Sequence, residues 1–214
     1  MVKTVSYTHT NSYETLFELT EKTKNIWICF HGLGYLSTYF KRYFEGLNAQ
    51  DNYVIVLQAP SKSYIGTDFK HVGACWLTMV DTTQEMNNNL DYINTVLTAE
   101  NVVGDSRMVL FGYSQGVSIA TRFLKSYHHP VKALLLHSGS IPKELTSEDG
   151  VHFKKYCSRF IHIAGKKDEY SNESIIKREK EKIDLLFGTD CELYRPEIKH
   201  VVHVPLIKEI AKTL

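Results

Sequence analysis

The pentapeptide Gly112-Tyr113-Ser114-Gln115-Gly116 constrains the fold of this chain more than any other segment. It fits the G-x-S-x-G pattern of a nucleophile elbow, in which a serine occupies a sharp turn between a strand and a helix. The apolar run at residues 107–111 predicts the strand, and residues 117–124 are apolar at helical spacing. Such a corner strains the backbone and exposes the serine side chain. Ser114 is therefore a candidate nucleophile, and the alternative is an ordinary serine at the N-cap of a helix.

The composition predicts one domain spanning residues 1–214 and gives no sign of a charged partner. The chain has 25 Lys and Arg residues against 24 Asp and Glu, and this balance argues against nucleic acid as a partner. We find no apolar signal-peptide core and no long apolar run, so stable membrane insertion is not expected. The four scattered cysteines form no C-x-x-C pair, which favours free thiols in a reducing cytosol. We therefore expect a cytoplasmic protein, and its oligomeric state stays open.

Short apolar runs alternate with longer amphipathic segments along the chain. Residues 2–9 and 13–19 are expected to form an antiparallel opening pair. Further strands are expected at residues 25–30, 53–57, 131–136, 159–164 and 191–194. Helices are expected around 39–47, 86–97, 176–186 and 205–214, where Pro205 suits a first turn. This alternation predicts an α/β domain with a mostly parallel central sheet. In such sheets ligands bind beyond the carboxyl ends of the strands, where Ser114 is expected to lie.

A nucleophilic serine needs a base and a group that orients the base. In hydrolases with this elbow, the order along the chain is nucleophile, acid, histidine. Asp168 directly follows an apolar strand and is the favoured acid, with Glu169 as a possible substitute. His200 is the favoured base over His203, because His203 lies so close to Pro205 that it can belong to the helix entry. The H-x-x-H pair lacks a third ligand nearby in sequence, so no metal site is predicted.

Acyl transfer also requires hydrogen-bond donors for a developing oxyanion. One donor is expected from the backbone N–H of Gln115, directly after the nucleophile. The second is expected from the backbone N–H of Leu33, within the FHGLG segment at residues 30–34. The alternative for that segment is a glycine-rich turn that leads into the next helix.

With these residues assembled, the chain resembles the phospholipase/carboxylesterase family of α/β-hydrolases, which includes acyl-protein thioesterases. The resemblance covers most of the chain from Ile26 onward. It is carried by FHGLG at residues 30–34, Ala59-Pro60, the segment at residues 74–76, GYSQG at 112–116, and the spacing from His200 to Leu214. It implies an α/β-hydrolase fold with a small lid loop, no large cap domain, and cleavage of carboxylic esters or thioesters. Lys199, Val117 and the loop at residues 164–170 depart from the family pattern and favour a small-molecule ester over a protein substrate.

The resemblance also places residues 61–80 beside the nucleophile. We expect Tyr35, Trp76 and Leu77 to line the substrate pocket, although an aromatic segment can also pack against its own domain. No phosphate loop, dinucleotide fingerprint or lysine suited to a Schiff base is found, so no cofactor is expected. A serine hydrolase is the leading hypothesis. The alternatives are an acyltransferase with the same triad and a catalytically silent binding module.

Overall fold

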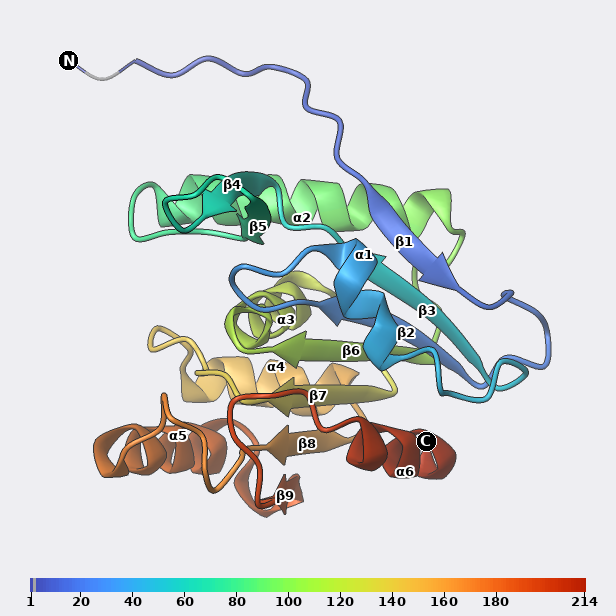
Figure 1. Ribbon diagram of the computed structural model, residues 1–214. Coiled ribbons are helices and arrows are strands. Elements are labelled where there is room, and N and C mark those ends of the chain that lie inside the picture. Colours follow the sequence, from blue (N-terminus) through green and yellow to red (C-terminus); the bar gives the residue numbers. More distant parts are fainter. Residues whose placement is uncertain (2) are drawn as a thin grey trace.

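A parallel sheet forms the centre of the molecule. The computed structural model describes Met1 and residues 3–214. Within these residues, seven strands form one sheet in the order β1-β3-β2-β6-β7-β8-β9 (Figure 1). The bounds are β1 Tyr13–Leu16, β2 Asn25–Phe30, β3 Asn52–Leu57, β6 Met108–Tyr113, β7 Ala133–His137, β8 Phe160–Ile163 and β9 Cys191–Tyr194. Only β1 runs antiparallel to its neighbour among these described strands. The predicted α/β fold with a mostly parallel sheet is confirmed.

Helices cover both faces of this sheet. The helical segments are α1 Ser37–Phe40, η1 Lys41–Tyr43, α2 Thr82–Ala99, α3 Gln115–Ser126, α4 Ser147–Tyr156, α5 Glu173–Leu186, η2 Gly188–Asp190 and α6 Val204–Thr213. In Figure 1, α1 and α6 lie in front of the sheet, and α3 and α4 lie behind it. Every residue of β2, β3 and β6 is buried, because alternate side chains enter the two cores on opposite faces. Continuous apolar runs are typical of strands covered in this way.

A separate two-stranded hairpin lies within residues 61–80, the segment that was expected beside the nucleophile. It consists of β4 Ser61–Ile65 and β5 His71–Cys75, which pair antiparallel. The carboxyl ends of β6, β7 and β8 point toward the same side of the molecule as this hairpin (Figure 1). The N–H of Gly34 donates to the carbonyl of Ala74 at 2.8 Å, so the hairpin is joined to the loop after β2. No large cap domain covers the sheet edge formed by the described residues.

Two predictions near the N-terminus were wrong. The expected opening pair is absent from residues 3–10, and Val2 lies outside the described residues. Instead β1 pairs with the edge of β3, because there its residues can pack on the core, whereas Val5 and Tyr7 are exposed. In place of the helix expected at residues 39–47, the chain forms only α1 and the short turn η1. Phe40 in α1 and Phe44 directly after η1 are nevertheless buried.

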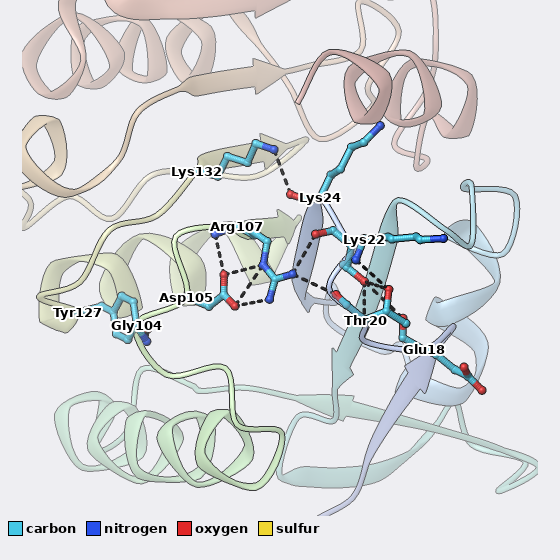
Figure 2. Close-up of polar contacts among 10 residues, drawn as sticks. Glu18, Thr20, Lys22, Lys24, Gly104, Asp105, Arg107, Tyr127 and Lys132 are labelled. Carbon is cyan, nitrogen blue, oxygen red and sulfur yellow. Dashed lines mark hydrogen bonds and ion pairs between the residues drawn. The ribbon is translucent and has the colours of Figure 1, made fainter.

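Polar contacts hold together the strand edge opposite the hairpin (Figure 2). The Arg107 guanidinium donates to the carbonyls of Thr20 and Thr23 at 3.2 and 3.0 Å, and it pairs with Asp105 at 2.6 Å. This pairing holds the pKa of the Asp105 carboxyl below its ordinary value. The Lys132 ammonium donates to the carbonyl of Lys24 at 3.0 Å. These contacts join the amino ends of β2, β6 and β7, so the sheet is held firmly at the end away from Ser114.

Candidate active site

Ser114 lies at the corner between β6 and α3. Its backbone has φ 52° and ψ −117°, a conformation that side-chain-bearing residues rarely adopt. The close crossing of strand and helix enforces this corner: a Cβ on Gly116 would lie 2.0 Å from the carbonyl oxygen of Phe30. The N–H of Ser114 donates to the carbonyl of His137 at 2.9 Å, which ties the corner to β7. The serine hydroxyl therefore stands beyond the carboxyl end of the sheet.

His200 and Asp168 meet Ser114 in a continuous hydrogen-bonded chain. Nδ1 of His200 lies 2.8 Å from Oδ2 of Asp168, and its Nε2 lies 3.0 Å from Oγ of Ser114. An ionised carboxylate only accepts hydrogen bonds, so Nδ1 carries the proton and Nε2 is free to accept the serine proton. Asp168 comes from the loop after β8, and His200 comes from the loop between β9 and α6.

The two alternative residues occupy other positions. His203 is the N-cap of α6, and its ring accepts the N–H of Leu206 at 3.1 Å. Glu169 turns away from the histidine ring and accepts the backbone N–H of His200 at 3.1 Å. Backbone N–H groups around this carboxylate keep the pKa of Glu169 below its ordinary value. Neither side chain lies between the serine and its partners, and the H-x-x-H pair diverges instead of converging on a metal ion.

The loop that carries the acid is fastened to the loop that carries the base. The N–H of Lys166 donates to the carbonyl of Pro196 at 2.9 Å, and that of Lys167 donates to Ile198 at 3.0 Å. Two tyrosines that sequence analysis did not assign complete this support. Tyr113 donates its hydroxyl proton to the carbonyl of His200 at 2.9 Å, and Tyr170 packs edge-on against the His200 ring at 4.8 Å between centroids. Their positions in the sequence could have indicated both tyrosines, because Tyr113 belongs to the G-x-S-x-G motif and Tyr170 lies two residues after Asp168.

The candidate oxyanion donors flank the serine. Among the described residues, neither the N–H of Leu33 nor the N–H of Gln115 has an acceptor. The loop that carries Leu33 presses against the nucleophile, since a Cβ on Gly32 would lie 3.1 Å from Cβ of Ser114. Buried His31 holds this loop in place: its Nδ1–H donates to the Gly32 carbonyl at 2.7 Å, and its Nε2 accepts the N–H of Ala59 at 3.1 Å.

The expected substrate-pocket residues separate into two groups. Tyr35 lines the cavity beside Ser114, but Trp76 and Leu77 do not line it. Trp76 is completely buried, packs against the ring of Phe30 and donates its indole N–H to the carbonyl of His31 at 2.8 Å. The Gln115 side chain accepts the N–H of Trp76 and donates to the carbonyl of Leu77, both at 2.9 Å. The prediction for Trp76 and Leu77 was wrong because this segment packs beneath the elbow as part of the core.

Two neighbouring cavities lie at this side of the molecule, and the larger of them contains the serine. The larger has a volume of about 870 Å³ and contains Ser114, His200 and Asp168 in its wall, together with residues from the ends of β7, β8 and β9. The smaller, of about 510 Å³, lies between the Leu33 loop and the hairpin, where Tyr64 and Ile65 line it. Leu33 and Tyr35 belong to both cavities. A molecule bound at the serine can therefore extend past these two residues into the smaller cavity.

Neither a membrane-spanning helix nor a metal cluster occurs in the described part of the chain. Over Met1 and residues 3–214, no helix has the length and apolar character to cross a bilayer. Over the same residues, no group of three His, Cys, Asp or Glu side chains is placed to hold a metal ion. The four cysteines are free thiols.

Comparison with known proteins places this fold in a defined class. Crystal structures with TM-scores of 0.71, 0.67 and 0.63 include acyl-protein thioesterase 2 of Zea mays, a carboxylesterase of Bacillus cereus and a phospholipase/carboxylesterase of Dyadobacter fermentans. In the same order, they are 16%, 13% and 13% identical to this chain. The alignments cover 95%, 95% and 97% of this chain and 97%, 92% and 99% of the other chains. No curated protein sequence matches the chain. The fold is that of the α/β-hydrolases.

The sequence itself narrows the class further. The family model for phospholipases and carboxylesterases matches residues 11–213. The chain belongs to the phospholipase/carboxylesterase family, as its sequence motifs indicated, and it is a carboxylic ester hydrolase.

Proposed function

We propose that this enzyme cleaves carboxylic esters through a Ser114–His200–Asp168 triad and an acyl-enzyme intermediate. The observation that carries the proposal is the unbroken chain of hydrogen bonds from Asp168 through His200 to the serine hydroxyl, at 2.8 and 3.0 Å. A serine hydroxyl is a poor nucleophile unless a neighbouring base removes its proton. Here Oγ of Ser114 attacks the ester carbonyl carbon while its proton passes to Nε2 of His200.

The remaining groups act on the tetrahedral intermediate that this attack produces. The N–H groups of Leu33 and Gln115 donate to the oxyanion. Asp168 keeps the proton of the imidazole on Nδ1 and stabilises the imidazolium. When the intermediate collapses, the carbon–oxygen bond to the alcohol breaks, and His200 gives its proton to the departing oxygen. Water then attacks the acyl-enzyme, loses a proton to His200 and releases the carboxylic acid.

The substrate is a small-molecule ester, and the shape of the site supports this choice. The smaller cavity offers aromatic and aliphatic side chains, among them Tyr64 and Ile65, for an apolar portion of the substrate. A thioester presents the same carbonyl chemistry to this site. The structural similarity to a thioesterase of Zea mays makes thioesters the second substrate type to test.

Labelling with a fluorophosphonate probe tests the nucleophile directly. We expect the purified protein to be labelled and the Ser114→Ala variant to remain unlabelled. Ser118→Ala is the matched control, because Ser118 lies one turn further along α3 in the wall of the same cavity. Labelling of Ser114→Ala at another residue would contradict the assignment.

Turnover then separates the possible reactions. Paired p-nitrophenyl and acyl-thiol substrates with the same acyl group compare ester with thioester cleavage. Product analysis in the presence of added alcohol or thiol distinguishes the free acid of hydrolysis from the new ester or thioester of acyl transfer. Formation of the free acid as the main product is the expected result. A labelled serine without turnover of any substrate would refute ester hydrolysis and favour a binding function.

A further inference from the structure

The larger cavity has a wall that the proposed triad does not use. This wall lies at the carboxyl ends of β7, β8 and β9 and carries Ser138, Ser140, His162 and Arg195. It adjoins the elbow directly, since a Cβ on Gly139 would lie 2.1 Å from the carbonyl oxygen of Ser114. A molecule held by Ser114 can therefore also contact this wall.

Arg195 brings an uncompensated positive charge to the wall. It directly follows β9, and its Nη1 donates to Nδ1 of His162 at 2.9 Å. Among the described residues, no carboxylate lies within ion-pair distance of its guanidinium, and this is its one hydrogen bond. By contrast, Arg159 at the other end of the same sheet edge is paired with Glu192. Arg195 is exposed, so water solvates its guanidinium and an anion that enters the cavity can reach it.

His162 adds a donor beside this charge. It is 2% exposed, and its Nδ1 must accept because an arginine N–H only donates. The ring proton therefore resides on Nε2, which has no acceptor among the described residues. Burial lowers the pKa of His162 to about 3, so the ring stays neutral and keeps this tautomer at physiological pH. The Nε2–H is a fixed donor in the cavity wall.

The hydroxyl groups of Ser138 and Ser140 can also donate hydrogen bonds to a ligand in the cavity. Nε2 of His137 accepts the N–H of His203 at 2.9 Å, so the proton of this buried ring lies on Nδ1. Nδ1 in turn donates to Oγ of Ser138 at 3.0 Å. Ser140 accepts from the Arg178 guanidinium at 3.1 Å. Each serine oxygen already accepts a hydrogen bond, so its own proton is available to the cavity.

The carboxylates in the cavity are already engaged. Asp168 accepts from His200, and Glu169 accepts the backbone N–H of His200. Glu179 accepts the N–H of Ile141 at 2.9 Å and one N–H of Arg178 at 3.1 Å. None of them makes an ion pair with Arg195. Lys166 also lines the cavity, but it pairs with Glu197 at 2.8 Å. Among the described residues that line the cavity, Arg195 is therefore the one cation without a carboxylate partner, and several neutral donors lie beside it.

We propose that this wall binds a carboxylate of the substrate, so that the enzyme acts on esters that carry a second, ionised carboxyl group. The inference rests on the proposed ester hydrolysis and names the substrate class of the same site. A carboxylate fits better than a phosphate dianion, since its single charge matches the single unpaired guanidinium. Arg195 binds the anion as an ion pair, and His162, Ser138 and Ser140 donate to its oxygens. The apolar remainder of the substrate extends toward the hairpin.

Matched ester pairs test this specificity. The p-nitrophenyl monoesters of adipate and suberate carry a free carboxylate on the acyl part, and p-nitrophenyl hexanoate and octanoate are their neutral partners. For a carboxylate on the leaving group, 4-butyryloxybenzoate is paired with its methyl ester. In the native enzyme, kcat/KM should be higher for the charged member of at least one pair. Which pair shows the preference identifies the end of the substrate that faces Arg195.

Substitution of Arg195 by methionine should abolish the preference. We expect the ratio of kcat/KM between charged and neutral esters to fall by about tenfold or more, mainly through KM. Arg42→Met is the matched control, because it removes an exposed arginine outside both cavities, and its ratio should equal that of the native enzyme. Ser138→Ala should lower the ratio by a smaller factor, and it provides the test if Arg195→Met does not fold.

The outcomes are distinguishable from failure of the ester hydrolysis itself. An unchanged ratio in a folded Arg195→Met enzyme that still cleaves neutral esters would overturn the carboxylate site alone. An equal loss for both members of a pair would also overturn it, since that pattern marks a positioning role. Absence of turnover for every ester would refute the proposed hydrolysis. Calorimetric titration of Ser114→Ala with adipate gives a readout without catalysis: binding that is lost when Arg195→Met is added supports the site, and no binding to Ser114→Ala contradicts it.

Discussion

At the residue scale, the hydrogen-bond partners of each histidine ring around the serine determine which ring nitrogen carries the proton. A backbone N–H or an arginine can only donate, so a ring nitrogen facing one must accept. His200 is the ring whose free acceptor faces a hydroxyl, that of Ser114. The neighbouring His203 has its acceptor occupied by the amide of Leu206 at the start of α6. The two histidines therefore differ in chemistry although they are three residues apart.

Substitution of each histidine should separate the two roles. His200→Gln should reduce kcat/KM by on the order of 10³-fold, because general-base catalysis is lost. His203→Asn keeps a residue that can cap α6, so activity should remain within a few fold, with a loss of stability below about 1 kcal/mol. Ester turnover and urea unfolding measure the two effects. The opposite ranking would assign the base to His203.

At the scale of elements, α3 is joined to the segment before α2 through the Gln115 side chain. Its side-chain amide accepts the backbone N–H of Trp76 and donates to the carbonyl of Leu77, two residues that do not line the cavity around Ser114. Gln115 thus has a backbone N–H that is the proposed oxyanion donor, and a side chain that holds a buried segment by hydrogen bonds. The strand-to-helix corner at Ser114 is therefore held by the Trp76–Leu77 segment as well as by the close packing of α3 against β2.

Gln115→Ala should reveal this bracing. The variant keeps the backbone N–H but leaves the buried N–H of Trp76 without an acceptor, which should lower the free energy of unfolding by about 1–3 kcal/mol. Gln84→Ala on the exposed side of α2 removes a solvent-facing hydrogen bond to Asn88 and should change stability by less than about 0.5 kcal/mol. Chemical unfolding of both variants makes the comparison. Equal stability would show that the segment is held by packing alone.

The elements that could be predicted from sequence are those whose pattern depends on local constraints. β2, β3 and β6 are unbroken apolar runs because both of their faces are covered, and Ser114 lies at their predicted edge. The segment at residues 3–9 alternates like a strand, yet it has no partner edge, since β1 occupies that of β3. Helix α4 was missed because Phe153 is its only large apolar residue that is buried, so no stripe marks it.

The same distinction applies to the site. Ser114, Asp168 and His200 were selected by chain order and by their places after strands, and the structure brings them together. Trp76 could not be placed correctly, because its burial depends on the His31 carbonyl and the Phe30 ring, which are distant in sequence. Arg195 and His162 were missed for a related reason. Only the absence of a carboxylate in three dimensions makes this arginine distinctive.

At the scale of the whole molecule, three buried histidines line the carboxyl edge of the sheet. Burial lowers the pKa of His31 to about 4 and the pKa values of His137 and His162 to about 3, from an ordinary value of 6.5. All three are neutral in the folded protein at neutral pH. As the pH falls below 6.5, the exposed histidines of the unfolded chain bind protons, whereas the buried histidines of the folded protein do not. Acid therefore stabilises the unfolded state relative to the folded state.

The free energy of unfolding should consequently decrease as the pH is lowered from about 6.5 to 4. Each buried histidine contributes a slope of up to about 1.4 kcal/mol per pH unit in this window, and the slope vanishes above the ordinary pKa. Urea unfolding at several pH values measures it. His137→Gln should reduce the slope by the share of about one proton, even if the variant is less stable at pH 7. A slope equal to that of the native protein would show that His137 does not contribute.

The fastening of the acid loop to the base loop has a consequence for exchanging parts between relatives. Backbone hydrogen bonds from Lys166 and Lys167 to Pro196 and Ile198 are independent of side-chain identity, but they require both loops to keep their lengths. An insertion in either loop would shift its partner and displace the proton relay as a unit. Grafts that transfer residues 164–170 and 195–200 together should preserve the relay, whereas single-loop grafts should not. Residues 164–170 and 195–200, although separated in sequence by a helix and a strand, are thus expected to be exchangeable only as a pair.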